Sequence, residues 1–127
     1  MNNKVLVIDD EQGIRDMMQY VLSEEGFDVA TAPDGIAGYE AYNKEKFDVV
    51  FLDVHMPAQK GTETLARIRE KNPEQAVIVC SSSHDPDYNF KEHAAELGVY
   101  HCFYKPVDID DVLTMMREAT KIKTQYP

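Results

Sequence analysis

The sequence predicts a single α/β domain in which five parallel strands alternate with five helices. The first observation is the length of 127 residues, which suits one domain. The second is a set of short apolar runs. Two of them, Val5–Ile8 and Val49–Leu52, are uninterrupted, as in strands buried on both faces of a parallel sheet. The third is that segments with helical periodicity separate these runs through short linkers, which favours right-handed strand–helix–strand units.

The first half of the chain is expected to hold three strands, at residues 5–8, 27–31 and 49–53. The first helix ends before Gly26, a residue type that suits the position just after a helix. Its apolar residues recur at helical spacing and are Ile14, Met17, Met18, Val21 and Leu22. A second helix opens at Asp34-Gly35 and is weakened by Gly38, which costs about 1 kcal/mol relative to alanine. Its apolar side is expected to include Ile36, Tyr39 and Tyr42.

The second half of the chain supplies the remaining strands, at 76–80 and 99–103, and the more polar second one is expected at a sheet edge. A third helix follows Gly61 and ends at Asn72-Pro73. Its inward residues are expected to be Leu65, Ala66 and Ile68. A polar helix runs from Asp85-Pro86, a cap followed by proline, to residue 97. The last helix is capped by Asp108, and its buried face is Ile109, Val112, Leu113, Met116 and Ala119. The domain spans 1–123, and 124–127 form a tail.

This alternation suits a doubly wound sheet with the flavodoxin-like strand order 2-1-3-4-5, whose ligand crevice lies between strands 1 and 3. Asp53 ends the third strand, directly before a segment that Pro57 stops. The predicted order therefore places Asp53 beside Asp9 and Asp10, which follow the first strand. The alternative for Asp53 by itself is a solvated turn residue.

Composition limits the function classes. The net charge is −10 and no basic block occurs, which argues against nucleic acid or an anionic membrane as a direct partner. No secretory signal and no run of about 20 apolar residues is present, so a cytoplasmic protein is expected. Cys80 and Cys102 lie in apolar runs and are interpreted as buried thiols, since a disulfide between them is disfavoured in a reducing compartment.

Polar residues at four predicted strand ends suggest one site. Asp9, Asp10 and Asp53 would repel one another by about 1 to 4 kcal/mol per close pair. A hard cation such as Mg²⁺ would offset that repulsion, although three solvated acids are the simpler alternative. Lys105 adds a point positive charge and Ser81 a hydroxyl. Together these groups suit phosphoryl transfer to a carboxylate.

These residues also carry a family resemblance. The chain resembles a bacterial two-component response-regulator receiver domain over nearly its whole length. The resemblance rests on Asp9-Asp10, on Asp53-Val54-His55-Met56-Pro57 with Gly61 four residues later, on Ser81, and on Lys105-Pro106, whose peptide bond is commonly cis in that family.

The resemblance implies roles for these residues. Asp53 would accept a phosphoryl group from a phosphohistidine of a sensor kinase or phosphotransfer protein. The Mg²⁺ ligands would be Asp9 (through water), Asp10, Asp53 and the backbone carbonyl of His55. Lys105 and Ser81 would bind phosphoryl oxygens. Phosphorylation would then switch a protein-binding face formed by residues 85–97, 99–103 and the last helix.

The sequence departs from the resemblance at Cys102, where receivers usually carry the tyrosine or phenylalanine that rotates with the switch serine. We therefore expect a weaker switch, or one carried by another element. His55 and Ser83 are predicted to set the lifetime of the phosphoryl group, with exposed loop residues as the alternative. The remaining histidines show no zinc spacing: His84, His93 and His101.

Two other functions compete with a phosphorylation switch. A phosphatase or phosphotransferase with an aspartate nucleophile often needs a second acid two residues later, where this chain has His55. No glycine-rich nucleotide loop is present either. A degenerate receiver that only binds proteins is the second alternative, and the presence of all the phosphorylation residues argues against it.

Overall fold

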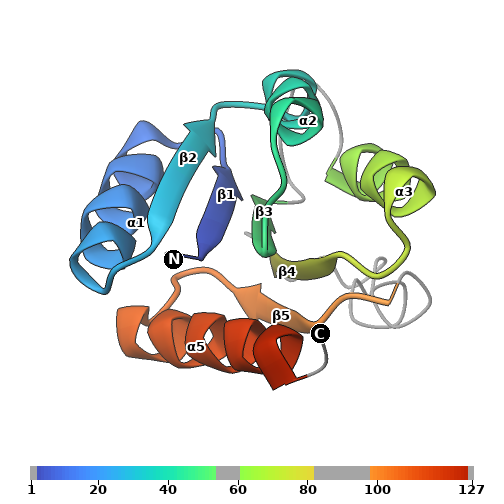
Figure 1. Cartoon of the computed structure of the whole chain (residues 1–127). Helices are drawn as coiled ribbons and strands as arrows, with labels where there is room; N and C mark the ends of the chain where they lie inside the picture. The colour runs from blue at the N-terminus through green and yellow to red at the C-terminus, as the bar shows by residue number, and fades with distance from the viewer. Residues whose placement is uncertain (1–2, 54–60, 82–97, 126–127) are drawn as a thin grey trace.

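The computed structural model describes residues 3–53, 61–81 and 98–125. It contains one sheet of five parallel strands in the order β2-β1-β3-β4-β5, as predicted (Figure 1). The strands are β1 (Lys4–Ile8), β2 (Asp28–Ala32), β3 (Val49–Asp53), β4 (Ala76–Ser81) and β5 (His101–Tyr104). The more polar β5 lies at an edge of this sheet, so that expectation is also confirmed.

Four helices cover the two faces of the sheet in the described part of the chain. They are α1 (Gln12–Glu24), α2 (Gly35–Lys44), α3 (Gly61–Lys71) and α5 (Ile109–Gln125). Helices α1 and α5 lie on one face, and α2 and α3 lie on the other (Figure 1). The helix expected over 85–97 falls outside the described residues. Helix α5 continues to Gln125, slightly beyond the expected start of the tail at residue 124. None of the described helices is long and apolar enough to cross a membrane.

The alternation of side chains along the strands divides the core into two layers. One layer joins the sheet to α2 and α3 through Leu6, Ile8, Val50, Leu52, Tyr42, Leu65 and Ile68. The other joins it to α1 and α5 through Val5, Val7, Val49, Phe51, Met18, Leu22, Val112 and Met116. Because both faces of β1 and β3 are buried, their uninterrupted apolar runs are accounted for.

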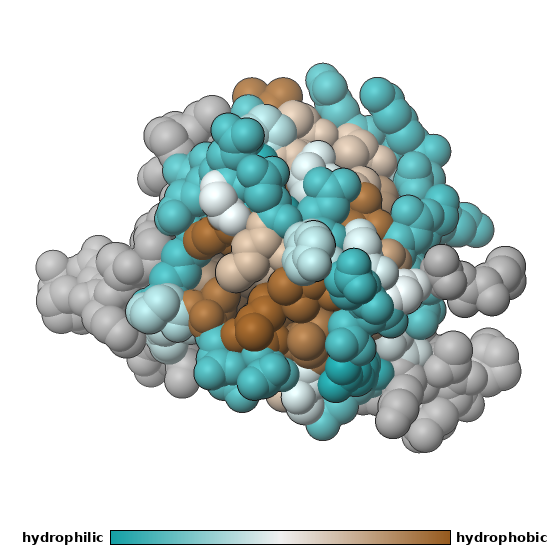
Figure 2. All heavy atoms as spheres, turned by 90° about the vertical axis from the view of Figure 1, so that its left-hand side faces the viewer, coloured by the Kyte–Doolittle hydropathy of each residue, from teal (hydrophilic) through white to brown (hydrophobic). Residues whose placement is uncertain are grey.

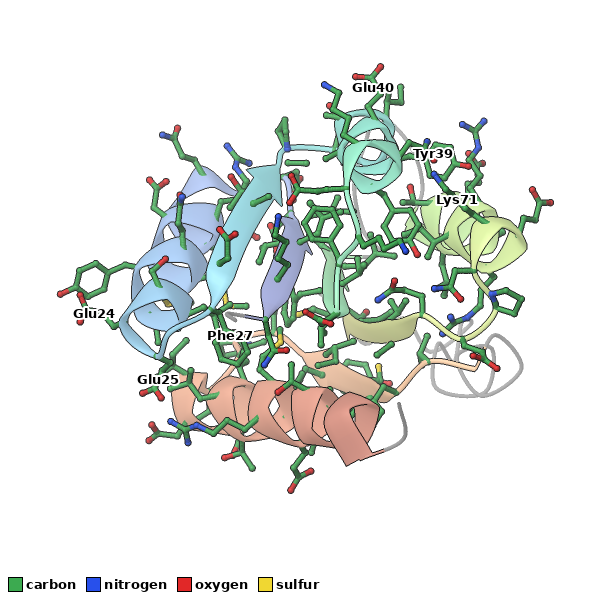
Figure 3. All side chains as sticks on the ribbon, viewed as in Figure 1. Glu24, Glu25, Phe27, Tyr39, Glu40 and Lys71 are labelled. Atoms are coloured by element: carbon green, nitrogen blue, oxygen red, sulfur yellow. The ribbon has the colours of Figure 1, made fainter. Side chains whose placement is uncertain are left out.

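Polar side-chain contacts join neighbouring helices within each layer. Glu25 lies at the end of α1 (Figure 3) and pairs with Arg117 of α5. On the opposite face Lys71 of α3 (Figure 3) hydrogen-bonds to Asn43 of α2, and its ammonium lies 5.8 Å from the centroid of the Tyr42 ring. These contacts are exposed, so they fix helix positions more than they add stability.

Helix ends follow the predicted signals. Gly26 has a φ of 94°, a left-handed conformation that glycine adopts without a Cβ penalty, and it ends α1. The Asp34 side chain accepts a hydrogen bond from the Ala37 amide at 2.8 Å and caps α2. Asp108 accepts from the amides of Asp110 and Asp111 and caps α5 in the same way.

Two helix faces differ from the prediction. Ile36 was expected to be inward but is 54% exposed, while Gly38 is buried. The reason is close packing, because a Cβ on Gly38 would lie 2.5 Å from Ile8 Cδ1. Ala66 was also expected to be inward and is exposed, whereas the buried Thr64 occupies that side of α3.

The two cysteines are free thiols. Cys80 is buried in the layer of α1 and α5, and the half-buried Cys102 packs on the other layer. The register explains this separation, because Cys80 pairs with Phe103 and Cys102 with Val79. A disulfide between them is excluded by this geometry, since adjacent positions on paired strands point to opposite faces.

Candidate functional site

The four strand ends singled out in the sequence meet at one edge of the sheet. Asp9 and Asp10 follow β1, Asp53 ends β3, and Ser81 ends β4. Lys105 follows β5 directly. Because β1, β3, β4 and β5 are neighbours in that order, the structure brings these residues together at the switch point of the sheet.

Three carboxylates converge at this edge. One oxygen each from Asp9, Asp10 and Asp53 lies within 4.8 Å of the others. Asp9 is fully buried and Asp53 is 1% exposed, while Asp10 is exposed. Burial raises the pKa of Asp9, and this effect is opposed by the Glu11 backbone amide, which donates to Asp9 Oδ1 at 2.9 Å, and by Lys105.

Lys105 provides the positive charge among these acids. Its Nζ lies 3.1 Å from Asp9 Oδ2, 3.2 Å from Asp53 Oδ2 and 3.0 Å from Glu11 Oε1. Burial disfavours its ammonium, but the bond to Glu11 and the charges of Asp53 and Asp9 outweigh that effect and raise its pKa. Lys105 therefore stays protonated over the physiological pH range.

The donor set fits a hard divalent cation. All three acids offer oxygen ligands, which Mg²⁺ prefers. Asp9 Oδ2 is buried and accepts no aligned hydrogen bond, although Lys105 Nζ is near it. Lys105 contacts Asp9, Glu11 and Asp53, and Asp10 lies near Asp9 and Asp53, so four acids face one lysine in this site. Negative charge is therefore in excess, and a cation would reduce it.

Ser81 and the segment after β5 complete the described part of the site. Ser81 is 1% exposed, and its carbonyl accepts a hydrogen bond from the Lys105 amide at 2.8 Å. The Lys105-Pro106 peptide is cis, as the resemblance implied. Cys102 lies two residues before Tyr104, which pairs with Ser81. His55 and Ser83 fall outside the described residues.

Two neighbours of the acids received no role in the sequence analysis. Glu11 binds Lys105, and its signal was present as the third acid of the run after β1. Arg15 lies one turn into α1, and its guanidinium donates to the Asp9 carbonyl oxygen at 2.8 Å. No sequence pattern indicated Arg15, because its partner is a backbone atom.

A groove of about 490 Å³ opens beside Lys105. Its lining consists of Glu11, Ile14, Met17, Lys105, Pro106 and Val107. Figure 2 views the side of the molecule on which α1 lies, and an apolar area there is bordered by hydrophilic residues. Lys105 and Glu11 are thus reached from outside through a partly apolar surface.

The comparisons with known proteins agree with this geometry. Residues 5–117 match the response regulator receiver domain family. Sporulation initiation phosphotransferase F of Bacillus subtilis is 31% identical over 124 residues, which cover 98% of each chain. Chemotaxis protein CheY of Listeria monocytogenes is 33% identical over 119 residues, covering 93% of this chain and 98% of the relative.

Solved structures of response regulator and chemotaxis proteins are also similar to this chain. A response regulator receiver domain protein from Clostridium thermocellum matches with a TM-score of 0.89 and 29% identity, covering 98% of this chain and 99% of that one. Chemotaxis protein CheY4 of Vibrio cholerae matches with a TM-score of 0.85 and 26% identity, over 94% and 99% of the two chains. From the family match, the similarity to these relatives and the shared fold, we conclude that the chain belongs to the response regulator receiver domain family, whose members act in two-component signalling.

Proposed function

We propose that this protein accepts a phosphoryl group on Asp53, with Mg²⁺ as cofactor, from a sensor histidine kinase or a phosphotransfer protein. The observation that carries the proposal is the buried Asp53 carboxylate, held 3.2 Å from Lys105 Nζ with two further acids close by. A rigid strand end presents this carboxylate at the crevice of the sheet, where a donor can reach it.

The chemistry follows from these groups. A carboxylate oxygen of Asp53 attacks the phosphorus of a phosphohistidine, the P–N bond breaks, and an acyl phosphate forms. Asp9, Asp10, Asp53 and the His55 carbonyl would hold Mg²⁺. When bound, this ion neutralises negative charge on the phosphoryl oxygens. The Lys105 ammonium binds a phosphoryl oxygen as a positive point charge, and the Ser81 hydroxyl donates a hydrogen bond to another.

Phosphorylation would switch a protein-binding face made of residues 85–97, β5 and α5. Moving a two-state equilibrium from 1:99 to 99:1 requires about 5.5 kcal/mol. Two hydrogen bonds to a charged phosphoryl group, from Lys105 and Ser81, contribute about 1.5–3 kcal/mol each and come close to that value. As part of this proposal, the protein works in the cytoplasm with protein partners, consistent with its net charge of −10.

The alternative of a binding module that never takes a phosphoryl group has less support. Asp53 and Lys105 are in contact in the described site, and the other acids are buried or adjacent. Burying carboxylates at this edge of the sheet costs stability, and a protein used only for docking would gain no chemical function from them in return. A classical enzyme is not proposed, since the receiver family is one of signalling domains.

Intact-mass spectrometry tests the proposal directly. The protein is incubated with acetyl phosphate, with and without Mg²⁺, beside Asp53→Ala and the matched control Asp28→Asn. Asp28 is an exposed acid at the other end of the sheet, 3.9 Å from Lys4. One phosphoryl addition is expected in the parent and in Asp28→Asn, only with Mg²⁺, and none in Asp53→Ala. Absence of any addition in the folded parent protein, with kinases also tried as donors, would favour the binding module.

A further inference from the structure

We propose that Glu11 is a latch on Lys105. Its carboxylate holds the lysine in the unphosphorylated protein and slows phosphoryl uptake at Asp53. This inference rests on the proposed function and adds a positioning residue to it. It begins from the 3.0 Å contact between Glu11 Oε1 and Lys105 Nζ, which is as short as the contacts that Lys105 makes to the two buried acids.

The Glu11 side chain is diverted from a local role to make this contact. Glu11 is the N-cap residue of α1, but it makes no side-chain cap hydrogen bond. The structure describes the caps of two other helices, α2 and α5. Their cap residues, Asp34 and Asp108, each accept a hydrogen bond from a backbone amide of the same helix. The first turn of α1 therefore lacks the side-chain acceptor that the first amides of a helix usually find.

Lys105 has no donor to spare for a phosphoryl oxygen. An ammonium carries three N–H groups, and three carboxylates, those of Asp9, Glu11 and Asp53, surround this one. A phosphoryl oxygen must displace one of them. The side chains of Asp9 and Asp53 are 0% and 1% exposed, whereas that of Glu11 is 57% exposed.

Glu11 is therefore the partner that Lys105 releases. A carboxylate that already faces water regains its hydration at little cost, while a buried carboxylate that lost the lysine would keep its negative charge in a poorly hydrated site without that cation. Glu11 and Lys105 also line the groove beside the site, so a donor group can approach them there. The latch competes with the incoming phosphoryl group for the same ammonium.

The size of the effect follows from the exposure of Glu11. Exposed ion pairs change an equilibrium by about 1.4- to 5-fold. We expect Glu11→Gln to raise the rate of phosphorylation about 2- to 5-fold. The Asp9 carboxylate should keep its position in this variant, because its bond to residue 11 comes from the backbone amide.

Three variants separate a latch from a general charge effect. Glu11→Asp keeps the charge but is one methylene shorter, so it cannot reach Lys105, and as a better cap it should not weaken α1. Asp16→Asn removes a charge from an exposed position on the same helix, outside the site. A latch predicts that Glu11→Asp matches Glu11→Gln and that Asp16→Asn matches the parent.

The measurement is the rate of acyl-phosphate formation by intact mass, at saturating Mg²⁺ and several acetyl phosphate concentrations. A melting temperature close to that of the parent shows that a variant is folded. Faster uptake in both Glu11→Gln and Glu11→Asp supports the latch. Glu11→Asp at the parent's rate overturns it and assigns any change in Glu11→Gln to charge alone. No uptake by the parent itself defeats the proposed function, and the latch with it, which is a distinguishable result.

Discussion

Replacing Lys105 by methionine tests the electrostatic reasoning about the site. The Nζ atom lies 3.1 Å from Asp9 Oδ2, which corresponds to an attraction of about 5 kcal/mol at an effective dielectric constant of about 20. The attraction between Lys105 Nζ and Asp53 Oδ2, 3.2 Å apart, is of similar magnitude. The acids lie within 4.8 Å of one another, so each charged pair repels by at least about 3.5 kcal/mol on the same scale.

Methionine would therefore convert a net attraction into a net repulsion between two buried carboxylates. Removing one partner of a buried ion pair costs about 3–5 kcal/mol after relaxation. We expect Lys105→Met to lower the free energy of unfolding by that amount at neutral pH without a divalent cation. Added Mg²⁺ should restore part of the loss, by about 2.7 kcal/mol at a concentration one hundred times its dissociation constant.

The assay is urea unfolding followed by circular dichroism, with and without Mg²⁺. Lys46→Met is the matched control, because Lys46 is exposed and outside the site. It should change the free energy of unfolding by less than about 0.5 kcal/mol. A Lys105→Met protein as stable as the parent in the absence of Mg²⁺ would refute the reasoning, since the acids would then not depend on the lysine.

Three further predictions concern acid titration, packing and thiol reactivity. Burial raises the pKa of Asp9, so the folded state binds its proton more tightly than the unfolded state. Asp9 should therefore increase the free energy of unfolding as the pH falls from neutral through its raised pKa. Urea unfolding over a pH series should show this increase in the parent and not in Asp9→Asn. At neutral pH, Asp9→Asn should be the more stable of the two proteins. Gly38→Ala places a Cβ 2.5 Å from Ile8 Cδ1, so about 1–3 kcal/mol of overpacking opposes about 1 kcal/mol of helix propensity. Because Ile8→Val deletes Cδ1, the double variant should lose less stability than the sum of the single ones, and additive losses in a double-mutant cycle would contradict this. Burial raises the pKa of the Cys80 thiol to about 12, so alkylation at mildly alkaline pH, located by peptide mass spectrometry, should label Cys102 in the native protein and Cys80 only after unfolding.

The strand order and the position of the site could be predicted because the sequence of each central strand is an apolar run with a polar residue at its end. In β3 the run ends in Asp53, and in β4 it ends in Ser81. Parallel strands put such endings on one edge whatever the details of packing. This is why residues from β1, β3 and the segment after β5 could be expected together before any contact was known.

The helix faces were harder to predict, because tertiary packing decides them. In α2 a glycine faces the sheet because Ile8 leaves no room for a side chain, so hydrophobicity alone selected the wrong residue, Ile36. In α3 the small Ala66 was expected inward, but the buried position belongs to Thr64, whose hydroxyl accepts and donates no hydrogen bond within the described structure. Polarity was a poor guide at that position.

The position of Glu11 could not be derived from the sequence either. Asp9, Asp10 and Glu11 are three consecutive acids, and nothing in their order tells which of them reaches Lys105. The turn from β1 into α1 decides it. Asp9 is buried beside the lysine, Asp10 is exposed, and Glu11 contacts Lys105 from the N-cap position of α1.

The positions of Phe103 and Cys102 in β5 allow the switch itself to be tested. Phe103 packs in the layer of α1 and α5, whereas Cys102 packs in the opposite layer, so Phe103 cannot replace a missing aromatic at position 102 by a simple side-chain rotation. We therefore expect that binding of a phosphate mimic such as beryllofluoride causes little rearrangement near Ser81 and Cys102.

Crystal structures or amide chemical shifts of the free and mimic-bound protein measure this rearrangement. Cys102→Tyr is the informative variant, because the half-buried edge position gives a larger side chain access to solvent. If aromatic rotation transmits the signal in relatives, the variant should gain shifts around β5 that the parent lacks. A large shift near Ser81 and Cys102 in the parent would show that the half-buried thiol is sufficient, and that the switch does not depend on an aromatic ring at this position.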